Sequence, residues 1–309
     1  MHKKYSAVAI GSCYLDINCP HYPFGASGIP AEVELVGDQY EAVPGGSAVN
    51  FCRLLSGLGL KPVFIGMSGT DPIASVLSQL LEEQGVHALF AARSDLSTNI
   101  SFAMTSPEHQ HIMLVSGTAN PALNPDDILP KLREVIGDTD LLFMGGCFKL
   151  KAFEQSFATI TQMAKEQGVK LVVDHNRIPK GTTDSMLAAV KELVLSADYY
   201  LPSRDEFCAF WQVTTIEEGL ELLNREAPGL TVVVKDGANG AHYFENGTVQ
   251  HVPAEVVSGK LQLTGAGDSF NGGVMAALEN DKPLSEAVAY ACQVAAAKIS
   301  GQPLPKTAK

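Results

Sequence analysis

Long apolar runs and paired cysteines are both missing from this chain of 309 residues. Its hydrophobic runs at 170–173 and 230–235 fall far short of the roughly 20 residues that a helix needs to cross a bilayer. The six cysteines include no Cys-x-x-Cys pair, so we expect neither a zinc site nor a disulfide framework. A signal-peptide core and cleavage site are also absent from the first residues. We therefore predict a cytoplasmic protein with reduced thiols.

Basic residues are scarce as well. Lys and Arg number 22 against 34 Asp and Glu, which gives a formal net charge of −12. An acidic chain repels nucleic acid and anionic membranes, so neither is an expected partner. The content of 46% hydrophobic and 18% charged residues is typical of a globular protein. The length suits one large α/β domain, or one domain with a small appendage.

Strand-like and helix-like segments alternate through most of the chain. Strands are predicted at 5–10, 61–65, 141–144, 170–174, 199–201, 231–235 and 241–245. Helices are predicted at 47–58, 72–84, 152–166, 185–196, 204–211, 216–225, 269–278 and 284–299. This alternation indicates an α/β fold, with a central, mostly parallel sheet flanked by helices on both faces.

Two strand-rich segments, 13–43 and 86–118, interrupt the alternation. The first is rich in Pro and Gly, and the second contains a hairpin with strands at 100–105 and 111–116. We predict that they form a small β-strand lid over the carboxyl edge of the parallel sheet, within a single domain of residues 1–309. Edge-to-edge pairing of lid strands from two subunits would protect their unpaired edges and give a homodimer.

The segment Thr264-Gly265-Ala266-Gly267-Asp268 directly precedes a predicted helix. Its small residues let backbone N–H groups approach an anion, and the helix adds the positive end of its dipole. A carboxylate fits this place if Asp268 takes a proton from a nucleophile while the turn holds the charge that develops in phosphoryl transfer. In the alternative interpretation, Asp268 only complements the helix dipole. These residues alone do not decide between the two.

Other motifs occur in a fixed order before this segment. Gly45-Gly46-Ser47-Ala48-Val49-Asn50 lies near the N-terminus, and Asp174-His175-Asn176-Arg177 and Lys235–Gly240 follow it. Together with the segment at 264–268 they resemble the signatures of the ribokinase-like, or PfkB, carbohydrate kinase family. Two ordered signatures about 200 residues apart are far more specific than one glycine motif. The resemblance covers 5–301 and implies a kinase that uses ATP and Mg²⁺.

The resemblance also implies a role for each matching residue. Asp268 would be the general base that takes the proton of the substrate hydroxyl, and the anion hole around the phosphoryl group would be Gly265, Ala266 and Gly267. Residues expected to bind the substrate are Asp16, Gly45, Gly46, Asn50 and Arg177. Residues expected at the nucleotide are Ser203, Lys235, Gly237, Gly240, Thr264 and Cys292. Glu206 resembles the acidic residue of the Asn-x-x-Glu motif, which organises Mg²⁺ and phosphate.

The chain departs from the family pattern at two places. Ser203 stands where the Asn of Asn-x-x-Glu is usual, which weakens the expected phosphate contacts. Gln262-Leu263-Thr264 replaces the common Asp-Thr-Thr, whose Asp helps to hold a monovalent cation. Because a neutral amide is a poorer ligand for K⁺ than a carboxylate, we predict weak or absent activation by K⁺. A large rate gain on adding K⁺ to the assay would contradict this prediction.

The expected substrate follows from a further absence. Lys and Arg do not occur from 12 to 52, and Arg93 is the one basic residue other than His in 86–118. A sugar phosphate needs a well-placed cation, so we expect an unphosphorylated sugar, a sugar acid held by a single Arg, or a nucleoside. Arg177 or Lys149 could supply such a charge from elsewhere. The alternatives are a nucleoside kinase of the same fold and a catalytically weak regulator that binds sugar or nucleotide.

Two further residues have open roles. His175 could form a catalytic pair with Asp174 or line the cleft, because it follows a predicted parallel strand. Trp211 lies on a predicted helix among Phe207, Phe210 and Val213, where core packing is the expected role.

Overall fold

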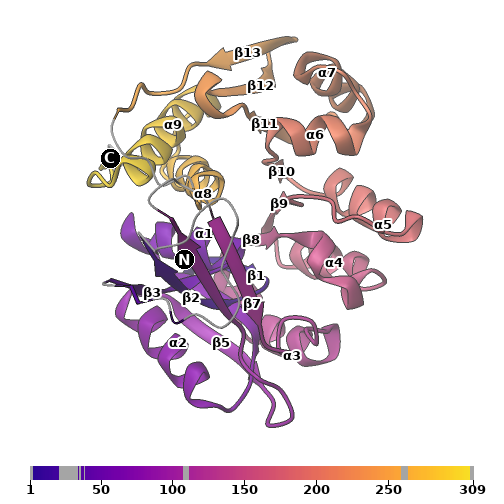
Figure 1. The fold of residues 1–309 in the computed structure, drawn as a ribbon. Helices are drawn as coiled ribbons and strands as arrows, with labels where there is room; N and C mark the ends of the chain where they lie inside the picture. Colours follow the sequence, from indigo (N-terminus) through magenta and orange to yellow (C-terminus); the bar gives the residue numbers. More distant parts are fainter. Residues whose placement is uncertain are drawn as a thin grey trace.

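The computed structural model describes residues 3–20, 34, 36–37, 39–106, 111–258 and 264–306. Within these residues, the main sheet has nine strands in the order β13-β12-β11-β10-β9-β8-β1-β4-β5 (Figure 1). Neighbours from β5 to β11 are parallel, and β12 is antiparallel to both β11 and β13. The strands are β1 (Tyr5–Ile10), β4 (Pro62–Ser68), β5 (His87–Ala92), β8 (Thr139–Gly145), β9 (Lys170–Asp174), β10 (Tyr199–Tyr200), β11 (Thr231–Lys235), β12 (Ala241–Glu245) and β13 (Thr248–Val252).

Apolar side chains lie on both faces of this sheet. On β8, Leu142 and Met144 belong to one buried core, whereas Leu141 and Phe143 belong to a second. Successive side chains of a strand point to opposite faces, so both faces need a cover. The first core is covered by α3 (Pro125–Val135), α4 (Phe157–Glu166), α5 (Asp184–Leu195), α6 (Arg204–Trp211) and α7 (Ile216–Glu226). The second is covered by α1 (Ser47–Gly57), α2 (Pro72–Glu83), α8 (Ala266–Leu278) and α9 (Leu284–Ser300).

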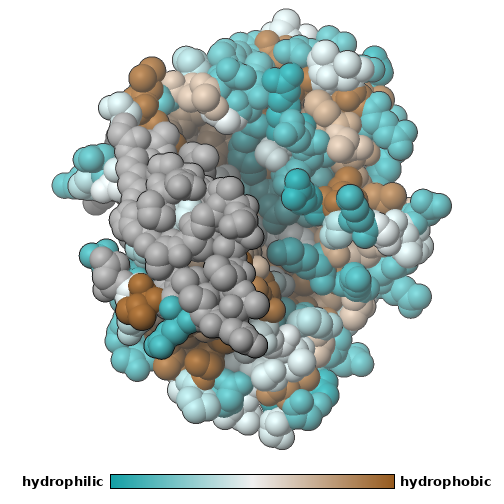
Figure 2. Space-filling view, in the orientation of Figure 1, coloured by the Kyte–Doolittle hydropathy of each residue, from teal (hydrophilic) through white to brown (hydrophobic). Residues whose placement is uncertain are grey.

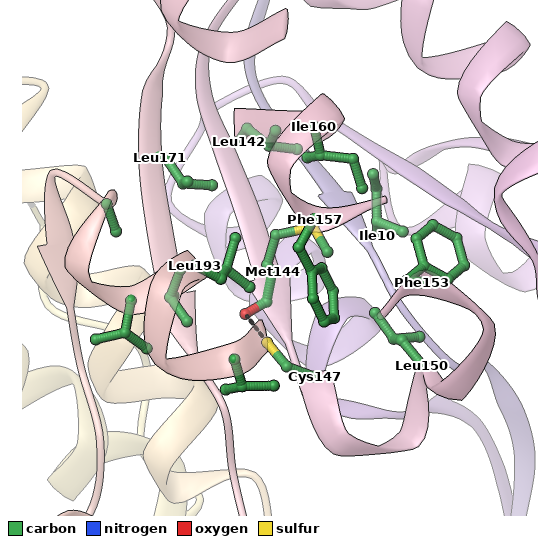
Figure 3. Close-up of a cluster of buried hydrophobic side chains, with 14 of the residues drawn as sticks. Ile10, Leu142, Met144, Cys147, Leu150, Phe153, Phe157, Ile160, Leu171 and Leu193 are labelled. Carbon is green, nitrogen blue, oxygen red and sulfur yellow. Dashed lines mark hydrogen bonds between the residues drawn. The ribbon is translucent and has the colours of Figure 1, made fainter. Parts of the chain in front are cut away.

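Figure 3 shows part of the first core, where side chains from α4 and α5 surround Met144 of β8. The fold class expected from the sequence, a mostly parallel sheet between two layers of helices, is thus confirmed. No helix in the described part of the chain is both long and apolar enough to cross a membrane.

A second, smaller sheet lies apart from the main one. Its strands are β2 (Tyr14–Cys19), β3 (Glu41–Gly45), β6 (Ile100–Thr105) and β7 (His111–Ser116), in the order β3-β2-β6-β7. β6 and β7 form the predicted antiparallel hairpin, and β2 pairs with β6 in parallel. The edge strand β7 exposes Met113, Leu114 and Val115, which are 67%, 55% and 55% exposed. The homodimer through lid strands stays a prediction.

The predicted lid segment 86–118 begins too early. Residues 87–92 form β5, which pairs in parallel with β4 at the edge of the main sheet, with Val63 opposite His87. The reason is that α2 acts as a crossover helix, which returns the chain to the sheet beside the strand it left. The part of this segment that joins the smaller sheet therefore starts only at Ile100, and its role as a lid stays a prediction.

Two buried asparagines fix the junction between the sheets. Asn120 accepts a hydrogen bond from Cys13 N at 3.0 Å and donates Nδ2 to Cys13 O at 2.8 Å. Its own backbone N donates to Asn99 Oδ1 at 2.7 Å, and Asn99 O accepts from Leu15 N at 3.0 Å. These bonds fix where the chain passes from β1 of the main sheet into β2 of the smaller sheet, and so they position Asp16, which follows Leu15.

Candidate active site

The segment 264–268 forms the start of α8. Gly265 caps the helix with a φ of 77°, in the left-handed region that favours glycine, and Ser269 N donates to Gly265 O at 2.9 Å. The N–H groups of the first helical turn have no partner within the helix, so the turn from Gly265 to Gly267 can receive an anion. Figure 2 shows that the face of the molecule turned to the viewer is hollowed near its centre, with hydrophilic residues along the visible part of the hollow.

The carboxylate of Asp268 is held from a second helix. Ser47 Oγ donates to Asp268 Oδ1 at 2.6 Å, and Asn50 Nδ2 donates to Asp268 Oδ2 at 2.9 Å. Ser47 and Asn50 are three residues apart on α1, so both side chains lie on the same face of that helix. The two predicted signatures therefore meet in space, 218 residues apart in the Asn50 pair.

The surroundings make Asp268 a stronger base than an ordinary aspartate. Burial raises the pKa of Asp268, while the hydrogen bonds from Ser47 and Asn50 oppose the rise. Asp174 raises this pKa further and Lys235 lowers it. Since a general base works best when its pKa lies nearer to the working pH, the direction of the shift suits proton abstraction.

Asp16 lies where β2 passes the glycine pair. A Cβ atom on Gly45 would lie 1.7 Å from Asp16 Oδ2, so the carboxylate is packed onto the glycine backbone. Burial raises the pKa of Asp16, and a hydrogen bond from Ser101 of β6 opposes the rise. Gly46 has a φ of 109°, and a Cβ atom there would lie 2.2 Å from Ser12 O. The predicted substrate residues Asp16, Gly45 and Gly46 are thus close together.

Two cations act on Asp16: Lys149, which the sequence offered as a distant source of charge, and Arg53, which it did not. The positive charges of Arg53 and Lys149 both lower the pKa of Asp16. Lys149 Nζ lies 5.9 Å from the ring centroid of Tyr14, and Arg53 Nη1 donates to Pro44 O at 2.7 Å. The basic-free segment ends at residue 52, one residue before Arg53, and parallel-strand topology brings Lys149 in from after β8. Arg177 is exposed in the loop after β9, and within the described residues no hydrogen bond or ion pair joins it to Asp16.

The side chain of Lys235 is held inside the protein. Its ammonium is buried and donates to Asp174 Oδ2 at 2.6 Å, Leu201 O at 2.5 Å and Asn271 Oδ1 at 3.0 Å. All three N–H groups are therefore used inside the protein. The ammonium therefore lies beneath the start of α8, and a contact of Lys235 with the nucleotide stays a prediction.

His175 does not pair with Asp174. Its ring is fully buried among Phe148, Tyr200 and Phe210, with the ring centroid of Phe210 at 4.5 Å. Burial lowers the pKa of His175, which favours the neutral ring, and the aromatic side chains around it belong to the first core or pack against it. Trp211 lies in the same core, which confirms its predicted packing role.

Residues 4–302 match the sequence pattern of the family described as pfkB family carbohydrate kinase. The chain belongs to this family. A ribokinase from Haemophilus influenzae is 24% identical over 278 residues, covering 86% of this chain and 84% of that protein. A 5-dehydro-2-deoxygluconokinase from Lacticaseibacillus casei is 24% identical over 310 residues, covering 97% and 91%. The solved structure of a putative ribokinase II from E. coli in complex with ATP and Mg²⁺ has a TM-score of 0.79 at 20% identity, covering 98% and 96%.

Membership of the PfkB family confirms the predicted enzyme class. The chain is a kinase of the kind that acts on sugars or nucleosides, a phosphotransferase whose acceptor is a hydroxyl group. The family is ATP-dependent. The likeness to the solved structure confirms the ribokinase-like fold that the sequence predicted.

The residues predicted at the nucleotide of this PfkB kinase have mixed environments. Gly237 and Gly240, with φ of 55° and 102°, form the turn after β11, and Thr264 is exposed before α8. Cys292 of α9 is buried in the second core, where burial raises its pKa to about 11. Cys292 can therefore shape the wall of a cleft by packing, but its thiol does not titrate near neutral pH.

Glu206 is the residue that could hold Mg²⁺. Glu206 Oε2 accepts from Ser203 N at 3.3 Å and also from Ser203 Oγ, at the start of α6. No group of three or more His, Cys, Asp or Glu side chains in the described residues could hold a metal ion. A single carboxylate still fits Mg²⁺, which keeps several waters and binds one or two carboxylates together with substrate phosphates. Burial raises the pKa of Glu206, and the charge of Asp174 raises it further.

The sequence analysis did not predict the roles of three candidate site residues. Ser47 shares Asp268 with Asn50, and its signal was its position three residues before Asn50 in the first signature. Ser101 reaches Asp16 from β6 of the smaller sheet, and only the pairing of β2 with β6 reveals this contact. Asn271 binds Lys235 and had no signal beyond its place on the helix that begins at Ala266.

Proposed function

We propose that this PfkB kinase transfers the γ-phosphoryl group of ATP to a hydroxyl of a small unphosphorylated sugar or sugar acid, with Asp268 as the general base. The observation that carries the proposal is the position of Asp268. Its carboxylate lies in the first turn of α8, beside the glycine turn, and two side-chain donors of α1 hold it. A carboxylate that served only the helix dipole would need neither donor.

The proposed reaction uses each part of this geometry. Asp268 accepts the proton of the substrate hydroxyl as its oxygen bonds to the γ-phosphorus, and the bond from that phosphorus to the bridging oxygen of ADP breaks. The N–H groups from Gly265 to Gly267 receive the charge of the phosphoryl group. Mg²⁺, when bound with ATP through Glu206 and water, supplies neutralisation of phosphate charge. Asp16 binds substrate hydroxyls at the lid side of the site.

The charges near Asp16 support a neutral or singly acidic substrate. Asp16 itself repels anions, while the exposed Lys149 beside Tyr14 can pair with one carboxylate. The names of the relatives agree with this range, since one is a ribokinase and another a 5-dehydro-2-deoxygluconokinase. A nucleoside is the second candidate, because an adenosine kinase from Schizosaccharomyces pombe is also 24% identical over 284 residues.

A substrate panel tests the proposal. Purified protein would be assayed for ADP release with ATP, Mg²⁺ and free aldoses, ketoses, sugar acids, nucleosides and fructose 6-phosphate. In parallel, thermal shifts would be measured with a non-hydrolysable ATP analogue, because a ligand of the native state raises the melting temperature. We expect turnover and a shift with a free sugar or a sugar acid. Turnover of fructose 6-phosphate with free sugars inert would contradict the substrate class, and tight binding without any turnover would indicate a regulator.

A further inference from the structure

Lys235, Asp174 and Asn271 form a closed polar cluster beneath α8. Lys235 ends β11 and Asp174 ends β9, whereas Asn271 lies on α8, three residues after Asp268. Asn271 Nδ2 donates to the same Asp174 Oδ2 that binds Lys235, at 2.7 Å. The three residues are 9%, 1% and 0% exposed. The cluster is therefore a buried ion pair joined directly to the helix that carries the proposed base.

Stability alone does not account for this ion pair. Taking two charges out of water costs free energy, and apolar residues of the same volume are often as stable or more so. The place of the ammonium is also unfavourable for α8, since a positive charge near a helix N-terminus opposes the helix dipole. A Cβ atom on Gly267 would lie 3.6 Å from Lys235 Nζ, so no side chain separates the ammonium from the first turn of α8.

We propose that the buried pair of Lys235 and Asp174 is an electrostatic support for Asp268, with Lys235 as a positioning residue of the reaction. The proposal rests on the proposed function of Asp268. Four residues beside the burial itself act on Asp268: Ser47 and Asn50 from α1, Asp174 from β9 and Lys235 from β11. The first two are neutral donors, and the last two are opposite charges held together at 2.6 Å. Asp174 favours the protonated form of Asp268, whereas Lys235 favours the ionised form, so the two charges of the pair act on Asp268 in opposite directions.

The same placement serves the phosphoryl group. When Asp268 takes the proton of the hydroxyl, its negative charge is lost while negative charge gathers at the turn from Gly265 to Gly267. The ammonium beneath Gly267 remains and adds positive potential to that turn, inside a site where charges are poorly screened. Lys235 acts on this turn through its charge and not by a hydrogen bond to the nucleotide, because all three of its N–H groups already have acceptors inside the protein.

Single charge removals should move Asp268 in predictable directions. Asp174→Asn leaves the ammonium unopposed, so the acid limb of the kcat/KM profile should move to lower pH by on the order of one unit. Lys235→Met removes the ammonium and leaves the charge of Asp174 unopposed, so the limb should move to higher pH. Lys235→Arg keeps the charge and should restore the wild-type limb. Lys170→Met and Asp198→Asn are matched controls, because these residues form an exposed ion pair at 2.7 Å near the other end of β9.

A readout without turnover separates this proposal from the proposed function. The titration of Asp268 can be followed by NMR of protein labelled with ¹³C at the aspartate carboxyls, with the signal assigned by its loss in Asp268→Asn. A protein without kinase activity whose Asp268 midpoint moves in these directions would remove the proposed function and keep the electrostatic support. An active kinase with equal midpoints in Asp174→Asn, Lys235→Met and wild type would overturn the support alone.

One measurement needs only the wild-type chain, in case a variant does not fold. The Lys235 ammonium has three internal acceptors, so its ¹H–¹⁵N signal should exchange slowly with water. We expect its chemical shift to change with the midpoint of Asp268. A slowly exchanging lysine signal whose chemical shift does not change as Asp268 titrates would overturn the proposal.

Discussion

Asp268→Asn is expected to lower kcat by roughly 10²–10⁴-fold, the range that one general base contributes. The amide keeps the size and planar shape of the carboxylate, but it cannot accept the proton of the substrate hydroxyl. Asn50 can still bond the amide oxygen, so the turn from Gly265 to Gly267 should keep its form. Binding of a non-hydrolysable ATP analogue should therefore change little. Steady-state kinetics with the best substrate, together with calorimetry of the analogue, measure both effects.

The control for this prediction is Asp126→Asn. Asp126 is an exposed carboxylate in the first turn of α3, so it has the helix-dipole role and no site around it. Loss of a charge of that kind costs about 0.3–1 kcal/mol of stability. If Asp268→Asn behaved like Asp126→Asn, with a small loss of stability and an unchanged kcat, the carboxylate would be only a dipole partner and the proposed mechanism would fail.

Much of the fold could be predicted because its strands are regular. The ranges expected for β6, β7, β9, β11 and β12 agree with the structure, since each is bounded by turn residues or charges. Helix α3 was not predicted, although Asn124 accepts from Asp127 N and Pro125 opens the helix. Pro130 lies inside α3, and a proline at an interior position normally ends a helix. Helix α4 begins only at Phe157, because residues 151–153 form a separate 3₁₀ turn.

The sequence motifs of the site could be predicted, but the hydrogen bonds between residues far apart in the chain could not. Asp268 and Asn50 belong to recognisable signatures, whereas Lys235 meets Asp174 across 61 residues and Asn271 across 36. A signal for the direction of Lys235 does exist in the strand itself. Val233 belongs to the second core under α8, and Lys235 follows it by two residues, on the same face of β11.

The same rule separates Asp174 from His175. Val172 of β9 belongs to the second core and Val173 to the first, so Asp174 continues toward α8 and His175 toward the aromatic cluster. Successive side chains along a strand point to opposite faces of the sheet, and the buried ring of His175 continues this alternation beyond Asp174. This alternation excludes the catalytic pair that the sequence neighbours suggested.

Gly46→Ala should destabilise the protein by about 2–6 kcal/mol. Gly46 has φ of 109° and ψ of 145°, a region that side chains other than glycine rarely enter, at a cost of roughly 1–3 kcal/mol. The new Cβ would also lie 2.2 Å from Ser12 O, and such overpacking costs about 1–3 kcal/mol more, because a backbone carbonyl cannot swing aside. Urea unfolding followed by circular dichroism gives the change in the free energy of unfolding.

Gly59→Ala at the other end of α1 is the matched comparison. Gly59 has φ of 85°, yet nothing lies within 4 Å of the position that its Cβ would take. Its substitution carries only the left-handed backbone cost, about 1–2 kcal/mol. Equal losses for Gly46→Ala and Gly59→Ala would show that Ser12 O does not confine the glycine. A larger loss for Gly46→Ala, joined by a fall in kcat, is expected because Gly46 sets the start of α1 and thereby the donors Ser47 and Asn50 that hold Asp268.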